Sequence, residues 1–432
     1  MEPIIFHIDV NSAFLSWTAL ERLEQGDTID LREIPSIIGG DQSKRHGVVL
    51  AKSTPAKKYG IQTGEPIVNA FRKCPTLTLA PPNHVMYRER SRKLMEYLAS
   101  ICPEIEQVSV DECYMDFTPI AHRYENCLTA AEEIKNSIYE KFHFTVNIGI
   151  SNRKVLAKMA SDFQKPNLVH TLFSYEIKEK MWPLTVDNLF MCGASSVETL
   201  RKLEILTIGD LAKANPQILS SHLKSHGITL WEFANGLDSS KVEPLPAQAK
   251  GIGNSTTVSR DIETSSDAHK ILMELAESVG HRLRKEQQLA GMVSCEIKYN
   301  TFRSVSHQTT LSVPTDSTTL IYETACHLFN ELWDGTPIRL LGIRTSKLCD
   351  TSEPVQMNLF DLMSPEPAAN SANDRKLSAS ANSMMNNTIS LTRKEKEEKL
   401  DKALDKIKNK YGKNAIIRGS LLPINNEKTK KD

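Results

Sequence analysis

Three carboxylates interrupt apolar, strand-like segments in the first quarter of the chain. Asp9 ends the run "IIFHID", and Asp111 with Glu112 interrupts "VSVDECYMDF". An ionised carboxylate is costly to bury without a partner, and three of them together need cations to balance their charge. If the two segments are neighbouring strands, the acids meet at one sheet edge. There they offer the oxygen ligands that Mg²⁺ or Mn²⁺ prefers.

The position of Asp111 directly before Glu112 constrains this site. Adjacent side chains of a regular strand point to opposite faces, so both acids can serve one site if they lie at a strand end or a hairpin turn, or if Glu112 reaches around the strand. Two divalent ions held there would suit phosphoryl or nucleotidyl transfer, by activating an attacking hydroxyl and neutralising a triphosphate. Spacing alone also allows a simpler interpretation, in which Asp9 caps a turn and residues 111–112 form a solvated loop.

The composition excludes several classes of protein. The 432 residues contain 53 Lys and Arg and 53 Asp and Glu, so the net charge identifies no partner. The eight cysteines form no C-x-x-C pair, which indicates reduced thiols in a cytoplasmic protein, without a disulfide framework or zinc site. We find no signal peptide and no run of roughly 18 apolar residues, so no membrane association is expected.

The pattern along the chain predicts two mixed domains separated by a helical one. The first 175 residues combine strand-like and helical segments in one α+β or α/β domain. The strand signal disappears over 176–238, which predicts a helical block, and the two prolines in 239–250 indicate a linker. A second mixed domain follows over 251–348.

The last part of the chain has a different composition. Residues 349–432 are rich in Ser, Asn, Pro and Ala and are expected to be mostly disordered. Near the end, "RKEKEEKLDKALDKIKNKYG" predicts a helix with a basic surplus. Its apolar residues Leu400, Leu404, Ile407 and Tyr411 form a narrow stripe.

Five motifs occur in an order and spacing that resemble the Y-family, or translesion, DNA polymerases. The resemblance is to the bacterial branch that includes polymerase IV and the UmuC-like enzymes, and it extends from about residue 4 to 361. The motifs are "HIDVNSAFLSW", "SVDECYMDFT", "VNIGISNRKVLAKMASDFQKPN", "GIGNSTTVSRDI" and "RLLGIRTSKL".

The resemblance implies an α+β, multidomain, right-hand architecture. It comprises a palm at 1–19 and 76–175, fingers at 20–75, a helical thumb at 176–238, a linker at 239–250, an α/β little finger at 251–348, and a tail at 349–432 that contains a clamp-binding peptide and the basic helix.

The resemblance also assigns the catalytic residues. Asp9, Asp111 and Glu112 would hold two Mg²⁺ ions, with Mn²⁺ as an alternative, and the main-chain carbonyl of Val10 would be a further ligand. Phe14 falls where the family places its steric gate. A large ring packed against the sugar would clash with a ribose 2′-hydroxyl.

The expected nucleotide contacts depart in part from the family. Lys165 matches the basic residue at the incoming deoxynucleoside triphosphate, where a lysine supplies a point charge. In the stretch "AKSTPAKKYG", Thr54 and Lys57 stand where relatives often have a tyrosine and an arginine. Lys57 keeps the charge but lacks the bidentate fork of arginine. Thr54 offers only a short hydroxyl.

Contacts with primer-template DNA are expected from two regions. Gly193 remains from the thumb's helix-hairpin-helix, although the second glycine of the usual G-x-G is missing. Basic residues of the second mixed domain can bind the DNA backbone without sequence preference. Among them we expect Arg284, Arg303 and Arg344 to contribute.

The segment "QMNLFD" at 356–361 resembles the peptide by which bacterial polymerases dock on the sliding clamp. Gln356, Leu359 and Phe360 carry the resemblance. Tethering to a clamp would raise the effective concentration of the enzyme at primer ends.

Together these residues predict a monomeric, error-prone DNA polymerase that extends primers across damaged templates within an SOS-type response. Two other classes remain open at this point. A nucleotide cyclase-like enzyme could use similar acids, and a primer-extension assay run against a cyclase assay separates the two. A non-catalytic DNA-binding subunit is opposed by the intact trio of acids.

Overall fold

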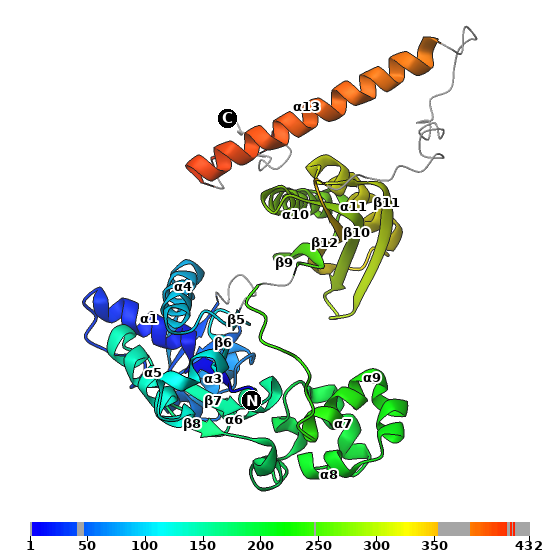
Figure 1. The fold of residues 1–432 in the computed structure, drawn as a ribbon. Coiled ribbons are helices and arrows are strands. Elements are labelled where there is room, and N and C mark those ends of the chain that lie inside the picture. Colours follow the sequence, from blue (N-terminus) through cyan, green and yellow to red (C-terminus); the bar gives the residue numbers. More distant parts are fainter. Residues whose placement is uncertain are drawn as a thin grey trace. The chain divides into compact units, whose positions relative to one another are not determined.

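The computed structural model describes residues 2–40, 47–245, 248–352 and 381–412, together with positions 415, 416, 418 and 419; for 381–395 it describes the backbone alone. The chain divides into two compact units, Met1–Ala247 and Gln248–Asp432. Figure 1 shows both units.

The first unit is built on a five-stranded mixed sheet. Its strand order is β5 (Ile105–Gln107), β6 (Glu112–Asp116), β1 (Ile5–Val10), β7 (Val146–Ser151) and β8 (Val169–Thr171). All neighbours are antiparallel except β7 and β8, which are parallel. The central position of β1 brings the first ten residues beside two segments that lie more than a hundred residues away.

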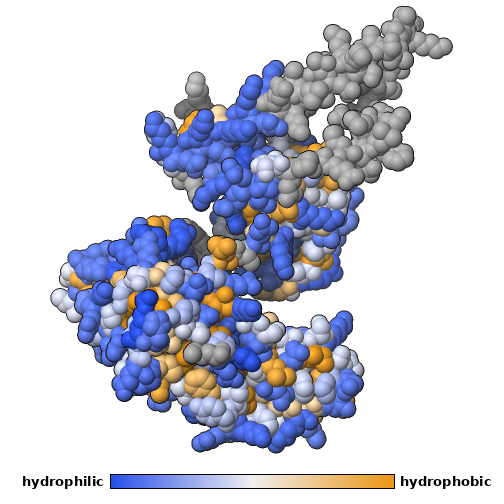
Figure 2. All heavy atoms as spheres, in the orientation of Figure 1, coloured by the Kyte–Doolittle hydropathy of each residue, from blue (hydrophilic) through white to orange (hydrophobic). Residues whose placement is uncertain are grey.

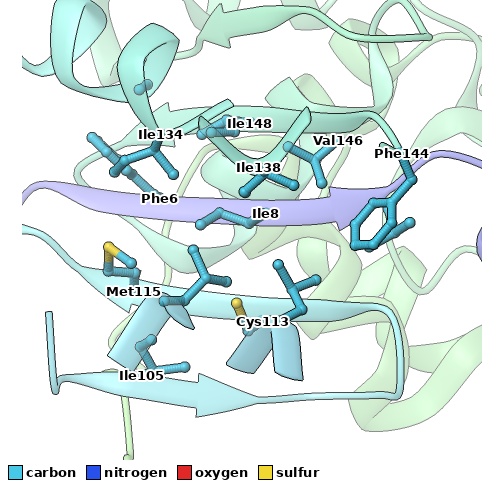
Figure 3. Packing of buried hydrophobic residues seen from close by; sticks show 14 of the residues in the cluster. Phe6, Ile8, Ile105, Cys113, Met115, Ile134, Ile138, Phe144, Val146 and Ile148 are labelled. Carbon is cyan, nitrogen blue, oxygen red and sulfur yellow. The ribbon is translucent and has the colours of Figure 1, made fainter. Parts of the chain in front are cut away.

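Strict alternation along β1 gives the sheet two different faces. Phe6 and Ile8 are buried in the main core (Figure 3). Val10 belongs to the same core. The helices α4 (His84–Ile101) and α5 (Cys127–Phe142) supply the other side of this core. The intervening residues His7 and Asp9 therefore point to the opposite face, which is covered by α6 (Lys154–Asp162).

A smaller layer lies between β1 and α4 in the sequence. Helix α1 (Ala13–Glu24) follows β1 directly. It is followed by a three-stranded sheet in the order β3 (Val49–Lys52), β2 (Ser36–Gly39), β4 (Thr78–Ala80). Two short helices, α2 (Thr54–Lys57) and α3 (Ile67–Lys73), complete this layer and share its small apolar core.

The last part of the first unit is helical, as the sequence predicts. Helices α7 (Ala194–Lys202), α8 (Ile208–Lys213) and α9 (Pro216–Ala234) enclose a third core. This core also includes Val155, Leu156 and Met159 of α6. Helix α6 is thus packed against the sheet on one side and against the helical region on the other.

The second unit is a four-stranded antiparallel sheet covered by two helices. The strand order is β11 (Ser304–Thr315), β10 (Gln288–Tyr299), β12 (Ile338–Asp350), β9 (Gly251–Ile262). Helices α10 (Ser265–Lys285) and α11 (Thr318–Leu332) bury their apolar faces on one side of it. The other side is hollowed and lined by small and polar residues, among them Gly253, Ser255 and Ser294.

The charged helix near the end of the chain is present as α13 (Ala381–Tyr411). The ends of its apolar stripe are open to solvent, because Leu400 is 51% exposed and Tyr411 66% exposed, whereas Leu404 and Ile407 are half-buried. The contact with α10 is made by charged residues such as Asp405 and Lys408. None of the described helices combines the length and apolar composition that crossing a bilayer demands.

Candidate active site

The strand register places two of the three acids directly opposite each other. Asp9 of β1 pairs with Glu112 of β6, so both carboxylates lie on the face covered by α6. Asp111 is the residue before β6, in the turn that connects it to β5, and its carbonyl accepts a hydrogen bond from Val10 N–H (3.0 Å). The hairpin turn that the sequence allowed for adjacent acids is therefore present.

A serine that the sequence did not single out organises this turn. The hydroxyl of Ser109 donates to Asp111 Oδ1 (2.5 Å) and accepts from the backbone N–H groups of Asp111 and Glu112 (both 3.2 Å). Burial raises the pKa of Asp111, and the negative charges of Asp9 and Glu112 raise it further. The three acids are thus close enough to repel one another electrostatically.

Two lysines from α6 and the loop after it neutralise the flanking acids. Lys165 Nζ lies 2.5 Å from Asp9 Oδ2 and 2.8 Å from Asp162 Oδ1. Lys158 Nζ lies 2.6 Å from Glu112 Oε2. Lys165 was expected near a triphosphate, whereas Lys158 was not anticipated. Its spacing of four residues from Asp162 on a helix was the only signal available.

A buried histidine of β1 contacts Glu112. His7 Nε2 lies 3.3 Å from Glu112 Oε2, and His7 Nδ1 lies 2.8 Å from Ser161 Oγ on α6. Burial lowers the pKa of His7, so its ring is neutral at pH 7. The contact with His7 and the ion pair with Lys158 lower the pKa of Glu112 to about 2. Glu112 is therefore a carboxylate at neutral pH.

The donor atoms at this edge are of the type that divalent cations require. Three carboxylates and the backbone carbonyl of Val10 offer oxygen ligands, and their mutual repulsion favours binding of a cation. In the described part of the chain, no three or more His, Cys, Asp or Glu side chains have the arrangement of a metal site. Lys158 and Lys165 instead bind two of the acids. The acids themselves fit a divalent metal in ligand type, charge and strand position.

One hollow of the first unit contains two of the three acids together with all three expected nucleotide-binding residues. It is lined by Asp9, Val10, Phe14, Thr54, Lys57, Asp111 and Lys165. Arg32 and Lys52 also line it and were not foreseen. Arg32 is bound to Asp30, and Lys52 donates to the carbonyl of Ile61 (2.6 Å). The hollow therefore combines the carboxylates of Asp9 and Asp111 with basic side chains of α2 and β3.

Phe14 is held rigidly at the start of α1. Its ring stacks on Tyr87 with centroids 4.4 Å apart and an angle of 7°, and it lies nearly perpendicular to the ring of His84, with centroids 5.9 Å apart. The hydroxyl groups of Tyr87 and Thr18 are hydrogen-bonded (2.7 Å), which fixes the supporting ring. A side chain placed in this way presents a fixed surface to whatever enters the hollow.

The expected DNA contacts occupy different environments. Gly193 is the N-cap of α7, with no atom near the position of an added Cβ. Arg303 is exposed and contacts Asp334 (3.3 Å), and Arg344 lies on the hollowed side of the second unit's sheet. Arg284 does not lie on an open surface, because its side chain is 11% exposed and its guanidinium is bound to Asp405 and Asp401. The clamp-peptide residues Gln356, Leu359 and Phe360 lie outside the described residues.

Comparison with known proteins connects this geometry to a family. Residues 8–162 match the model of the impB/mucB/samB family, and residues 249–359 match the C-terminal domain of that family. A protein of Clostridium acetobutylicum, DNA polymerase IV, is 44% identical over 98% of this chain and 99% of its own length. DNA polymerase IV 1 of Bacillus subtilis is 32% identical over 99% of this chain and 95% of its own length.

A solved structure agrees with the fold. A Y-family DNA polymerase chimera superposes with a TM-score of 0.71 and 21% identity, over 80% of this chain and 99% of its own. The predicted palm contains the five-stranded sheet of the first unit, and the predicted little finger lies in the second unit. Relatives of this family depend on divalent metal ions. The chain belongs to the Y-family of DNA polymerases, in the DNA polymerase IV branch, and is a translesion DNA polymerase.

Proposed function

We propose that Asp9, Asp111 and Glu112, with the carbonyl of Val10, hold a pair of Mg²⁺ ions for nucleotidyl transfer. The observation that carries this assignment is the pairing of Asp9 with Glu112 across β1 and β6, with Asp111 in the adjoining turn. When bound, the metal pair lowers the pKa of the primer 3′-hydroxyl and neutralises the triphosphate.

The residues around the acids have separate roles in this proposal. Phe14, fixed by Tyr87, occupies the space that a ribose 2′-hydroxyl would need. Lys57 and Thr54, on the wall of the hollow, bind the triphosphate. Lys165 now pairs with Asp9, so a triphosphate beside Asp9 competes for the same ammonium group.

The variant Asp111→Asn tests the assignment with little change of shape. We expect primer extension to fall by more than about a hundredfold, since even indirect ligands of catalytic metals cost 10–100-fold when altered. DNA binding should remain measurable. Asp116→Asn is the matched control, because Asp116 ends the same strand opposite Ile5, away from the acids. Full extension by Asp111→Asn would remove Asp111 from the site.

We further propose that the 356–361 peptide docks on a bacterial sliding clamp. An adjacent Leu-Phe pair in polar sequence suits a hydrophobic pocket. Replacing Leu359 and Phe360 by Ala should abolish capture by immobilised clamp, while Met357→Ala with Asn358→Ala should not. Retained capture would place the contact elsewhere. We propose that the chain acts as a monomer. Its mass in solution, measured on the purified protein, tests this.

A further inference from the structure

The last helix of the chain is attached to the little finger by a network of buried charges. Asp405 accepts from Arg284 Nε (2.6 Å) and contacts His281 Nδ1 (2.9 Å), both on α10. Lys408 Nζ and Arg418 Nε lie 2.6 Å and 2.7 Å from Glu277, also on α10. These contacts fix one face of α13 against the domain over two turns.

Asp401 is the most enclosed member of this network. Its carboxylate is 5% exposed and lies 3.2 Å from both Arg284 and Arg418. It also accepts the backbone N–H of Thr318 at 3.0 Å, the first residue of α11. A negative charge at a helix N-terminus is favourable, so Asp401 joins α13 to both helices of the domain.

Because α13 docks through its acids, its negative charges face the domain and most of its positive charges face solvent. In the stretch 396–411 the four acids are all buried or half-buried. Five of the six lysines are exposed there, and the sixth is Lys408, which is bound to Glu277. The burial of the acids adds to the basic surplus of the helix, so the surface it presents to solvent is basic. Hydrophilic residues predominate over the part of this unit visible in Figure 2.

The exposed lysines are spaced as a continuous stripe. Lys399, Lys402, Lys406 and Lys410 recur at intervals of three and four residues, which places them on one helix face. The stripe covers roughly 16 Å at 1.5 Å per residue. Double-stranded DNA presents a phosphate about every 3.4 Å along each strand, so several phosphates lie within this length.

We propose that this lysine stripe is an auxiliary DNA-binding surface that contacts the phosphate backbone. The proposal rests on the polymerase function of the chain, which supplies the polyanion. Arg284, expected to bind DNA itself, instead fixes the helix whose lysines do so. An anionic membrane is a poorer match. Such helices insert a broad apolar face, whereas the exposed large apolar residues of the docked stretch are only Leu400 and Tyr411.

The experiment compares two variants of the full chain with equal changes of charge. Lys402→Gln with Lys406→Gln removes the centre of the stripe, and glutamine preserves helix propensity. Lys93→Gln with Lys141→Gln, on exposed positions of α4 and α5, is the control. Affinity for a fluorescent duplex is measured from about 50 to 200 mM salt, a range over which phosphate contacts make affinity fall steeply. Thermal melting verifies that each variant is folded.

We expect the salt dependence of the stripe variant to be weaker: the negative slope of log affinity against log salt should become less steep by up to about 1.8. Its affinity should fall on the order of tenfold. The control should match the unmodified chain. An unchanged slope, or equal losses in both variants, would overturn the proposal. So would intact DNA binding with loss of binding to phosphatidylserine vesicles. Primer extension at saturating DNA should persist in both variants, so a failure here is distinct from a failure of the polymerase assignment.

Discussion

Gly149 allows helix α6 to approach the palm sheet closely, and an alanine there should damage the active site from a distance. Gly149 lies in β7, opposite His7 of β1. A Cβ added to it would lie 2.0 Å from the carbonyl oxygen of Ala157 and 2.4 Å from the backbone nitrogen of Ser161. Both are main-chain atoms of α6, so no side-chain rotation relieves the clash.

The size of the effect follows from these distances. Helix α6 must retreat by roughly 1.4 Å, the difference between 2.0 Å and an ordinary contact of 3.4 Å. Overpacking of this kind costs about 1–3 kcal/mol of unfolding free energy. The same helix carries Lys158, which is 2.6 Å from Glu112. Because a 1 Å misplacement in an active site can cost on the order of a hundredfold in rate, we expect a comparable loss in kcat.

Two measurements on Gly149→Ala check this reasoning: denaturant unfolding and single-nucleotide primer extension at saturating DNA. Gly193→Ala is the control, because an added Cβ there meets no atom within 4 Å, and it should change stability by less than about 0.5 kcal/mol. If Gly149→Ala kept both its unfolding free energy and its kcat, the packing of α6 would not position the site.

Three further predictions concern single contacts. Phe14→Ala should admit ribonucleotides, seen as a fall in the ratio of kcat/KM for deoxynucleotides over ribonucleotides. Lys158→Met should raise the pKa of Glu112 from about 2, so the acid limb of the pH–rate profile shifts to higher pH. The pKa of Asp405 is lowered by its hydrogen bonds from Arg284 and His281 despite burial. Its docking contribution is thus complete above the ordinary aspartate pKa and lost as pH falls below it, measured as faster hydrogen exchange in α13.

Much of the palm could be predicted because the relevant signals are local. The alternation of Phe6, His7 and Ile8 specifies one buried and one functional face, and the apolar run fixes β1 as a central strand. Two adjacent acids in a strand-like segment indicated a strand end or a turn, and the turn before Glu112 is present. The pairing of Asp9 with Glu112 follows once these strands are neighbours.

The supporting residues could not be predicted, since their roles arise from tertiary contacts. His7 is one more residue of a strand until Ser161 and Glu112 are placed beside it. The docking face of α13 could not be predicted for a related reason. An apolar stripe normally marks the buried face of a helix. Here the face that packs on the domain is instead the one carrying Asp401 and Asp405, which bind Arg284. Charge complementarity between distant segments has no periodicity to detect.

Helix α6 connects the chemistry of the palm to the thumb. Its inner face reaches Gly149, and its Lys158 side chain reaches Glu112. Its outer residues Val155 and Leu156 belong to the core of the helical region. The backbone N–H of Val155 is also capped by Asp238, directly after the thumb helices (2.9 Å). Because packed elements transmit displacement instead of absorbing it, any movement of the thumb that shifts α6 must also shift the lysine that holds Glu112.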